Sequence, residues 1–558
     1  MTAQWLEPLH NPLGFGAQDF FLLAWTLLFG VFALLWRPFL ERPLARLAER
    51  KWICASGLFT LCVILRLALL PHHPVPYPTI YDEFSHLLAA DTLRHFRFAN
   101  PPHEMRRFFE TFFVLQEPTY SSIYPIGQGL VLALAWNLFG SPWVGVVITT
   151  AALCALVYWM LRGWVEPGWA LAGGILALIE FGPLNPWMNN YWGGAVAASA
   201  GCLVFGALPR LREQARIRDG LLLGSGLGLH LLTRPYESVF LSLSILVYFA
   251  PALFRQEKLR PLKRPALFAA IPLLLALVVT GIQNKQVTGA WLTTPYQLSQ
   301  YQYGVPASLT FQQNPVPHRQ LTAEQALDYR MQSSFRSAPK ETLGSYWIRL
   351  EYRVRFYRFY LLPPLYLAVL AFLVRLRRYE DAWIVTTLAM FALGTNFFPS
   401  FQLHYIAAAT CLFVLISVKG LRVFRKWNAG PILFFLCVLH FAFWYGLHLC
   451  EDAAVSQALL RYETWTGLNS AQQPPRAIIE RELEAQPGKQ LVFVNYSPRH
   501  IFQNEWVWNA ADIDSARVVW ARDLGQAEDD KLRAYYPQRA AWILEADATP
   551  PRLARYGE

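Results

Sequence analysis

Two adjacent carboxylates, Asp82 and Glu83, are the residues of this chain best suited to chemistry. They lie in the run TIYDEF (79–84), directly after the second long apolar segment and at the start of a large loop. One carboxylate of such a pair can take the proton from a hydroxyl group as a general base, while the other positions the acceptor or a divalent cation. Thr79 to Asp82 is also spaced like a helix capping box, a purely structural alternative. The adjacency of the two acids favours the catalytic interpretation.

Two further clusters carry side chains that could act on a phosphate. Arg234 and Glu237 lie in TRPYE (233–237), where the arginine could hold a phosphate with two hydrogen bonds or simply pair with Glu237 at a tight turn. His404 and Tyr405 begin a late apolar segment. The histidine could donate to a leaving phosphate or a substrate hydroxyl, or the pair could belong to the aromatic belt at a membrane surface.

Four arginines, at 349, 353, 355 and 358, stand before another apolar segment. Arg353 and Arg358 are candidates for binding an anionic lipid phosphate, and the alternative is that these side chains snorkel along the membrane edge. No cofactor is certain. A divalent cation is an option, for which Asp82, Glu83 and His86 are the candidate ligands, although their spacing is not that of a metal motif.

The composition places these residues in a membrane protein. Of the 558 residues 54% are hydrophobic and only 16% are charged, against about a quarter charged in soluble domains. All seven cysteines fall in or beside apolar segments without a CxxC pair, which supports neither a disulfide framework nor a thiolate metal site. The net charge of +11 comes from basic residues clustered in short loops, so it indicates topology signals and membrane lipids as partners, and no nucleic acid.

The apolar segments predict an α-helical polytopic membrane protein with 12 or 13 membrane segments, because each is long enough to cross a bilayer. The first begins before any basic residue, so we expect a retained span instead of a cleaved signal peptide. The segments are 18–36, 52–70, 123–140, 143–161, 168–184, 192–208, 219–233, 238–254, 266–283, 357–375, 382–398, 403–419 and 430–449.

The basic connections set the expected orientation. Five of them (37–51, 209–218, 255–265, 375–381 and 419–426) are rich in Lys and Arg and are predicted to be cytoplasmic. This places both termini and the loops 71–122 and 284–355 outside, which requires an even number of spans. Either 123–140 or 168–184 must therefore be a partial or re-entrant segment.

Two regions outside the spans have predicted structure of their own. In loop 71–122, a helix is expected from about Tyr81, and Met105, Phe108, Phe109, Phe112 and Phe113 have the spacing of an amphipathic helix lying in the membrane interface. Residues 1–450 then form the membrane domain. The tail 451–558 is predicted to be a small extracytoplasmic α/β domain, with strand-like runs at 490–496 and 540–544 and a helix near 528–536. Its tryptophans at 506, 508 and 520 could stack on sugars or pack a core.

These motifs and their order resemble the integral-membrane C-type glycosyltransferases, which include protein O-mannosyltransferases and aminoarabinose transferases. The resemblance covers roughly residues 50–450 and rests on Asp82-Glu83, the Tyr124-Pro125 step and His404-Tyr405. Here an extra span, 18–36, precedes the catalytic loop. In place of a later acidic residue, NNYW (189–192) offers amides such as Asn190, and Glu237 is the candidate substitute.

The resemblance implies transfer of a sugar from a polyprenyl phosphate to an acceptor on the extracytoplasmic face of the plasma or inner membrane, usually with inversion. Asp82 is then the expected base, assisted by Glu83, with Arg234 and His404 stabilising the leaving phosphate. The acceptor is unknown and could be a protein, a lipid or a glycan. The alternatives are a non-catalytic protein that binds lipid-linked glycans, a flippase, or a transferase-like scaffold without activity. A flippase would need a polar path through the bilayer.

Overall fold

The computed structural model describes residues 17–253, 256–334, 341–450, 467–468 and 473–557. The start of the chain and most of the connection between residue 450 and the C-terminal domain lie outside the described residues. Each of the thirteen predicted apolar segments contains a helix. In chain order these are α1 (Ala17–Ala48), α2 (Lys51–Ala68), α4 (Ile126–Phe139), α5 (Pro142–Leu161), α6 (Pro167–Phe181), α7 (Ala195–Gln214), α8 (Ile217–Leu231), α9 (Pro235–Leu253), α11 (Lys263–Thr288), α15 (Leu365–Val374), α16 (Tyr379–Thr395), α17 (Thr410–Val423) and α18 (Ala429–Cys450).

The predicted class, a helical polytopic membrane protein with a small C-terminal sheet domain, is confirmed, but fewer helices are long enough to span. Among the described residues, seven helices have the length and apolar composition to cross a membrane, or up to nine if two bent pairs each count as one span. The prediction of 12 or 13 membrane segments was based on the lengths of apolar runs in the sequence. Several of the helices in these runs are shorter than the runs themselves. α4 has 14 residues, about 21 Å at 1.5 Å per residue, which is less than the ~30 Å hydrocarbon core.

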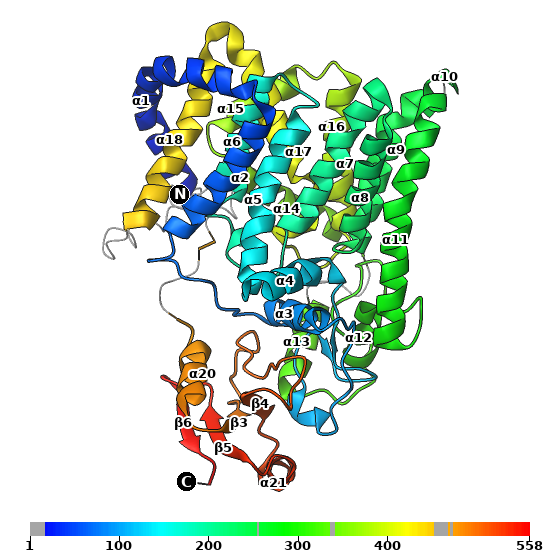
Figure 1. Cartoon of the computed structure of the whole chain (residues 1–558), viewed down its shortest axis with the longest axis vertical. Coiled ribbons are helices and arrows are strands. Elements are labelled where there is room, and N and C mark those ends of the chain that lie inside the picture. Colours follow the sequence, from blue (N-terminus) through cyan, green and yellow to red (C-terminus); the bar gives the residue numbers. More distant parts are fainter. Residues whose placement is uncertain (1–16, 254–255, 335–340, 451–466, 469–472, 558) are drawn as a thin grey trace.

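The orientation of the short helix α4 distinguishes the two candidates, 123–140 and 168–184, for the partial segment. It lies across the end of the upright helices, beside α3 (Tyr81–Arg94), whereas α6 packs upright against α5 and α17 (Figure 1). A Cβ built at Gly129 of α4 would lie only 3.1 Å from the Cβ of Ala89 in α3, so glycine permits this close packing. Of the two candidate segments, 123–140 is thus the one that does not run along the bundle.

The basic connections gather at the opposite end of the bundle. Ion pairs join residues of different connections there: Arg212 to Glu380 at 3.0 Å, Lys419 to Asp381 and Arg422 to Glu166. The short helix α10 (Gln256–Leu259), with η5 (Arg260–Leu262), marks the same end, far from the C-terminal domain (Figure 1). η8 (Phe424–Trp427) continues α17 into the last of these connections.

Loop 71–122 contains one of the two predicted surface helices. α3 begins at Tyr81, as expected. The predicted amphipathic helix over 105–113 is wrong: only Arg106–Phe109 form a 3₁₀ turn, η3, followed by the short hairpin of β1 (Val114–Leu115) and β2 (Ser121–Ser122). The phenylalanines at 108, 109, 112 and 113 are buried inside the protein. An irregular segment that is buried also needs apolar side chains, and here they happen to recur at the spacing of one helical face.

Loop 284–355 is also largely folded. It contains α12 (Pro295–Tyr303), α13 (Ala323–Ser334) and α14 (Leu343–Phe356), and α14 runs into η6 (Tyr357–Tyr360) before α15. The segment before α17 is a kinked 3₁₀ helix, η7 (Leu403–Ala409), and η4 (Pro186–Met188) precedes α7. α12 and α13 lie on the side of the bundle that bears α3 (Figure 1).

The C-terminal domain has the predicted α/β character. α20 (Pro475–Ala485) leads into a four-stranded sheet in the order β4-β3-β5-β6, made of β3 (Lys489–Asn495), β4 (Val518–Arg522), β5 (Arg539–Glu545) and β6 (Arg552–Arg555), with α21 (Gln526–Tyr535) between β4 and β5. β3 pairs in parallel with both β4 and β5, and β6 is antiparallel to β5. The buried strand residues form one core with Phe108 and Phe109 of loop 71–122, so this domain packs against the loop.

Candidate active site

Asp82 is the second residue of α3, and its side chain is half-buried. Its Oδ1 accepts a hydrogen bond from the hydroxyl of Tyr124, which stands just before α4. Burial raises the pKa of Asp82 to about 6, because loss of hydration outweighs the hydrogen bond from Tyr124 and the charge of Arg234, which both favour the ionised form. A carboxylate with such a pKa is ionised near neutral pH and is basic enough to accept a proton.

Glu83 has a different task from its neighbour. Its Oε2 accepts from the backbone N–H of Thr79 at 2.9 Å and of Ile80 at 3.4 Å, and its Oε1 accepts from the N–H of Tyr191 at 3.0 Å. The capping role that the sequence offered to Asp82 therefore belongs to Glu83, the third residue of the helix. Burial raises the pKa of Glu83, while these backbone donors act in the opposite direction. Glu83 anchors the start of α3 to the loop before α7.

Arg234 lies in the turn between α8 and α9, near enough for its charge to act on the carboxylate of Asp82. Its Nη1 is 3.9 Å from Oε1 of Glu237, and its Cζ is 5.4 Å from the ring of Tyr405. The side chain of Arg234 is 23% exposed, whereas that of Glu237 is 3% exposed. Arg234 therefore makes the structural pair that was the alternative, yet its charge also acts on Asp82. Oε1 of Glu237 is buried without a hydrogen-bond partner.

The residues at the start of η7 meet the loop before α7. His404 is buried, with its ring 5.7 Å from that of Trp192. The hydroxyl oxygens of Tyr405 and Ser400 are 3.3 Å apart. The amide oxygen of Asn190 is buried and has no hydrogen-bond partner. The loop 189–194 thus connects Glu83 on one side with His404 on the other.

The charge of Arg234 joins the predicted residues into one cluster. It acts electrostatically on Asp82 and His86 of α3, on Glu237 of α9, and on His404 and Tyr405 of η7. Electrostatic effects of this kind fall off steeply with distance. Three segments far apart in the sequence therefore converge around Asp82, at the end of the bundle that bears α3.

His86 lies one turn after Asp82, with its ring stacked on Tyr124 at 4.3 Å and an interplanar angle of 17°. Burial and Arg234 lower the pKa of His86 to about 3, so the ring is neutral at pH 7. Its Nδ1 is buried without a hydrogen-bond partner. Across the described ranges, no group of three or more His, Cys, Asp or Glu side chains is arranged to hold a metal ion. Asp82, Glu83 and His86 do not form the predicted triad, since backbone N–H groups occupy both oxygens of Glu83.

Asp328 of α13 is a second carboxyl group that sequence reasoning missed. It is fully buried, and Nε2 of Gln332 donates to both of its oxygens at 3.0 Å. Burial raises the pKa of Asp328 to about 7, with a contribution from the negative charge of Asp82. The available signal was the (i, i+4) spacing of Asp328 and Gln332, which places both on one face of a helix. Only the folded loop brings that face toward Asp82.

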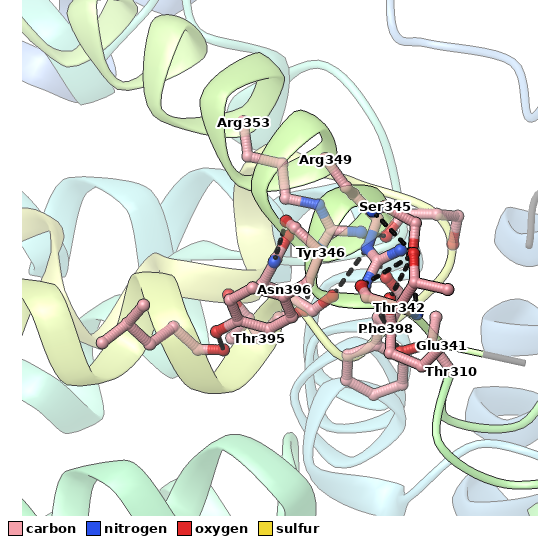
Figure 2. A network of polar contacts seen from close by, with 12 residues as sticks. Thr310, Glu341, Thr342, Ser345, Tyr346, Arg349, Arg353, Thr395, Asn396 and Phe398 are labelled. Carbon is pink, nitrogen blue, oxygen red and sulfur yellow. Dashed lines mark hydrogen bonds and ion pairs between the residues drawn. The ribbon is translucent and has the colours of Figure 1, made fainter.

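Arg349 and Arg353 form a polar network that holds the chain after α16, as Figure 2 shows. Arg353 donates to the carbonyl oxygens of Thr395 at 2.5 Å, of Ser400 at 2.9 Å, and of Phe398. Arg349 donates to the carbonyl of Asn396 at 2.8 Å and pairs with Glu341. Arg353 is fully buried, so it positions the segment leading to His404 instead of facing lipid. Arg358, on η6, stacks against Phe359 at 4.6 Å.

No protein-family model and no curated protein matches this chain. Several solved structures resemble it. ArnT from Cupriavidus metallidurans bound to undecaprenyl phosphate gives a TM-score of 0.49 at 12% identity, covering 88% of this chain and 93% of ArnT. The Archaeoglobus fulgidus oligosaccharyltransferase tethered with an acceptor peptide gives 0.43 at 10% identity, covering 88% of this chain and 69% of that one. The archaeal oligosaccharyltransferase AglB in complex with an inhibitory peptide and a dolichol-phosphate gives 0.37 at 11% identity, covering 89% and 69%.

These solved structures are membrane glycosyltransferases with the GT-C fold, the superfamily that the sequence resembles.

Proposed function

We propose that this chain is a membrane glycosyltransferase that moves a sugar from a polyprenyl-phosphate donor to an acceptor on the extracytoplasmic side. The observation that carries the proposal is the carboxylate of Asp82, held by Tyr124 opposite Arg234 at the end of a membrane bundle. A base and a phosphate-binding cation are the two groups that such a transfer requires.

The reaction follows from these two groups. The nucleophilic atom of the acceptor, such as a hydroxyl oxygen, bonds to the anomeric carbon of the sugar. Asp82 accepts the proton that this atom loses. The bond from that carbon to the phosphate oxygen breaks on the opposite face, so the configuration inverts. Arg234 stabilises the negative charge that develops on the departing phosphate, and the proton is retained on Asp82 until it is released to water.

The neighbouring residues complete the proposed site. Either neutral tautomer of His404 carries one ring N–H, which can donate to the phosphate. Tyr405 stacks on Arg234 and orients it. Asn190 and Glu237 each have a buried oxygen without a partner, and these oxygens can accept from sugar hydroxyls.

A lipid-linked donor suits the proposed position of the site. The basic connections at the far end of the bundle favour a cytoplasmic location for that end, which puts Asp82 outside. Soluble nucleotide sugars are made in the cytoplasm and do not cross the membrane, whereas a polyprenyl carrier presents its phosphate at the membrane surface. The acceptor is left open, as a protein, a lipid or a glycan.

The decisive experiment is replacement of Asp82 by asparagine in the full chain. With no base, we expect transfer from a polyprenyl-phosphate sugar to fall by about 10²- to 10⁴-fold, while the protein still binds the lipid. Asp530→Asn is the matched control, because Asp530 has a 52% exposed side chain on the C-terminal domain. Wild-type transfer by a folded Asp82→Asn variant would contradict the role of Asp82 as the base. Lipid binding without transfer by the wild-type protein would favour a non-catalytic binding protein or a flippase.

A further inference from the structure

The C-terminal domain touches the helix that carries Asp82. The ring of Trp508 stacks on Phe84 of α3, with centroids 4.5 Å apart and an interplanar angle of 20°. At the other end of α3, Oδ2 of Asp91 accepts from the backbone N–H of Ala511 at 2.7 Å. Arg476 lies over Trp508 with its Cζ 4.3 Å from the ring. Both ends of α3 are therefore held by the domain that follows the membrane bundle.

The same domain holds the helix that carries Asp328. Arg522, at the end of β4, donates from Nη1 to Oε2 of Glu324 at 2.7 Å, and Glu324 belongs to the first turn of α13. The other donors of Arg522 reach Oε2 of Glu505 at 2.8 Å and the carbonyl oxygen of Glu110 at 2.6 Å. Its side chain is 5% exposed and that of Glu505 is 1% exposed. One arginine thus joins the C-terminal domain, loop 71–122 and α13.

We propose that the C-terminal domain positions α3 and α13, and with them Asp82 and Asp328, with Arg522 and Trp508 as its positioning residues. The expected effect on sugar transfer rests on the proposed function, whereas the positioning itself rests on the packing of the C-terminal domain against α3 and α13. α3 and α13 lie in separate loops between membrane segments, and Figure 1 shows both at the end of the bundle where the C-terminal domain sits. A domain that binds both helices fixes the separation of the carboxyl groups of Asp82 and Asp328.

The hydrogen bonds of Arg522 support a positioning role for the domain over non-specific packing. A buried arginine that donates to two carboxylates and a carbonyl satisfies these partners only in one arrangement, so it specifies geometry more than it adds stability. Apolar packing alone, such as that around Phe108, would tolerate small shifts. Catalytic groups need placement to within about 0.5 Å.

The test compares Arg522→Gln with Arg522→Lys and with Arg533→Gln, a control at an exposed site of the same domain. We expect Arg522→Gln to lower kcat by about tenfold or more with little change in KM for the lipid donor, and Arg522→Lys to restore part of the rate. Glu324→Gln, which removes the partner on α13 and leaves β4 intact, should reproduce the loss.

A distance measurement provides a readout that does not depend on activity. Spin labels at Phe96→Cys, just after α3, and Arg330→Cys, on α13, report the separation of the two helices. Cys450→Ser removes the exposed cysteine, since the other six are buried. We expect a narrow distance distribution in otherwise wild-type protein and a broader or shifted one with Arg522→Gln.

Two results would overturn the inference: unchanged distance distributions with Arg522→Gln and Glu324→Gln, or wild-type kcat in both variants. These failures differ from failure of the proposed function, which is reported by Asp82→Asn in the same assay. If Asp82→Asn is inactive and Arg522→Gln is fully active, only the positioning role is wrong.

Discussion

At the scale of single residues, two neighbouring acids share the work at the start of α3. Glu83 accepts from three backbone N–H groups and from the Thr79 hydroxyl, and it fixes the helix. Asp82 accepts from the hydroxyl of Tyr124, and the charge of Arg234 acts on it. The division follows from helix geometry. The third residue of a helix can turn back to the free N–H groups at its start, and the second residue points away from them.

The pH dependence of transfer follows from the pKa of Asp82. A base must be ionised, so the rate should rise with pH through about 6, where burial places that pKa. Tyr124 donates to the ionised form and lowers this pKa. In Tyr124→Phe we therefore expect the acid limb at a higher pH, with a several-fold lower rate at pH 7 that recovers at pH 8 to 9. The measurement is kcat/KM for the lipid donor against pH.

Tyr301→Phe is the control for that experiment, because Tyr301 is 59% exposed on α12. A limb that stays in place, or moves to lower pH, in Tyr124→Phe would show that Asp82 is not the group whose ionisation limits the rate.

At the scale of elements, α3 is held at its N-terminus by Glu83, which links it to the loop before α7. Glu83→Gln keeps one acceptor oxygen and cannot serve both sets of N–H groups. We expect it to destabilise the protein by about 1 to 3 kcal/mol, the cost of leaving a buried donor unpaired. Thermal unfolding in detergent would measure this as a lower melting temperature.

Asp82→Asn should behave in the opposite way in the same assay. The pKa of Asp82 in the folded protein lies above its ordinary value of 3.8, so the folded state favours the neutral form. Stability therefore falls as the pH rises from about 3.8 to about 6, and the full cost of ionisation is present above that. The neutral asparagine avoids that cost. At pH 8 its melting temperature should equal or exceed that of wild type, and a fall similar to that of Glu83→Gln would contradict these separate roles.

At the scale of the whole molecule, the bundle has two chemically different ends. Ion pairs between basic connections mark one end, and α3, α13 and the C-terminal domain mark the other (Figure 1). If the basic end is cytoplasmic, a cysteine at Phe96, which is 95% exposed, should react with a membrane-impermeant maleimide in intact cells. A cysteine at Arg218, whose side chain is 67% exposed, should react only after permeabilisation. Both variants need Cys450→Ser, and the reverse pattern would place the site in the cytoplasm.

The sequence predicted the apolar segments, the start of α3 and the two strands of the tail, because each depends on composition or on local spacing. It also singled out Asp82, Arg234 and His404, since charged and polar groups beside apolar segments are conspicuous. It failed at residues 105–113, where aromatic side chains in irregular backbone were taken for a helix. The spacing of apolar residues cannot tell which surface will cover them.

The sequence by itself determined a helical membrane protein with an acidic pair in its first large loop and a folded tail, since hydropathy and charge patterns are written along the chain. Only the tertiary structure decided that Glu83 joins α3 to Tyr191, that the charge of Asp82 acts on Asp328, that Arg353 donates to backbone carbonyls and that the C-terminal domain contacts both loops. Each of these contacts joins residues separated by tens to hundreds of positions. Such contacts depend on how the helices pack, which no local pattern records.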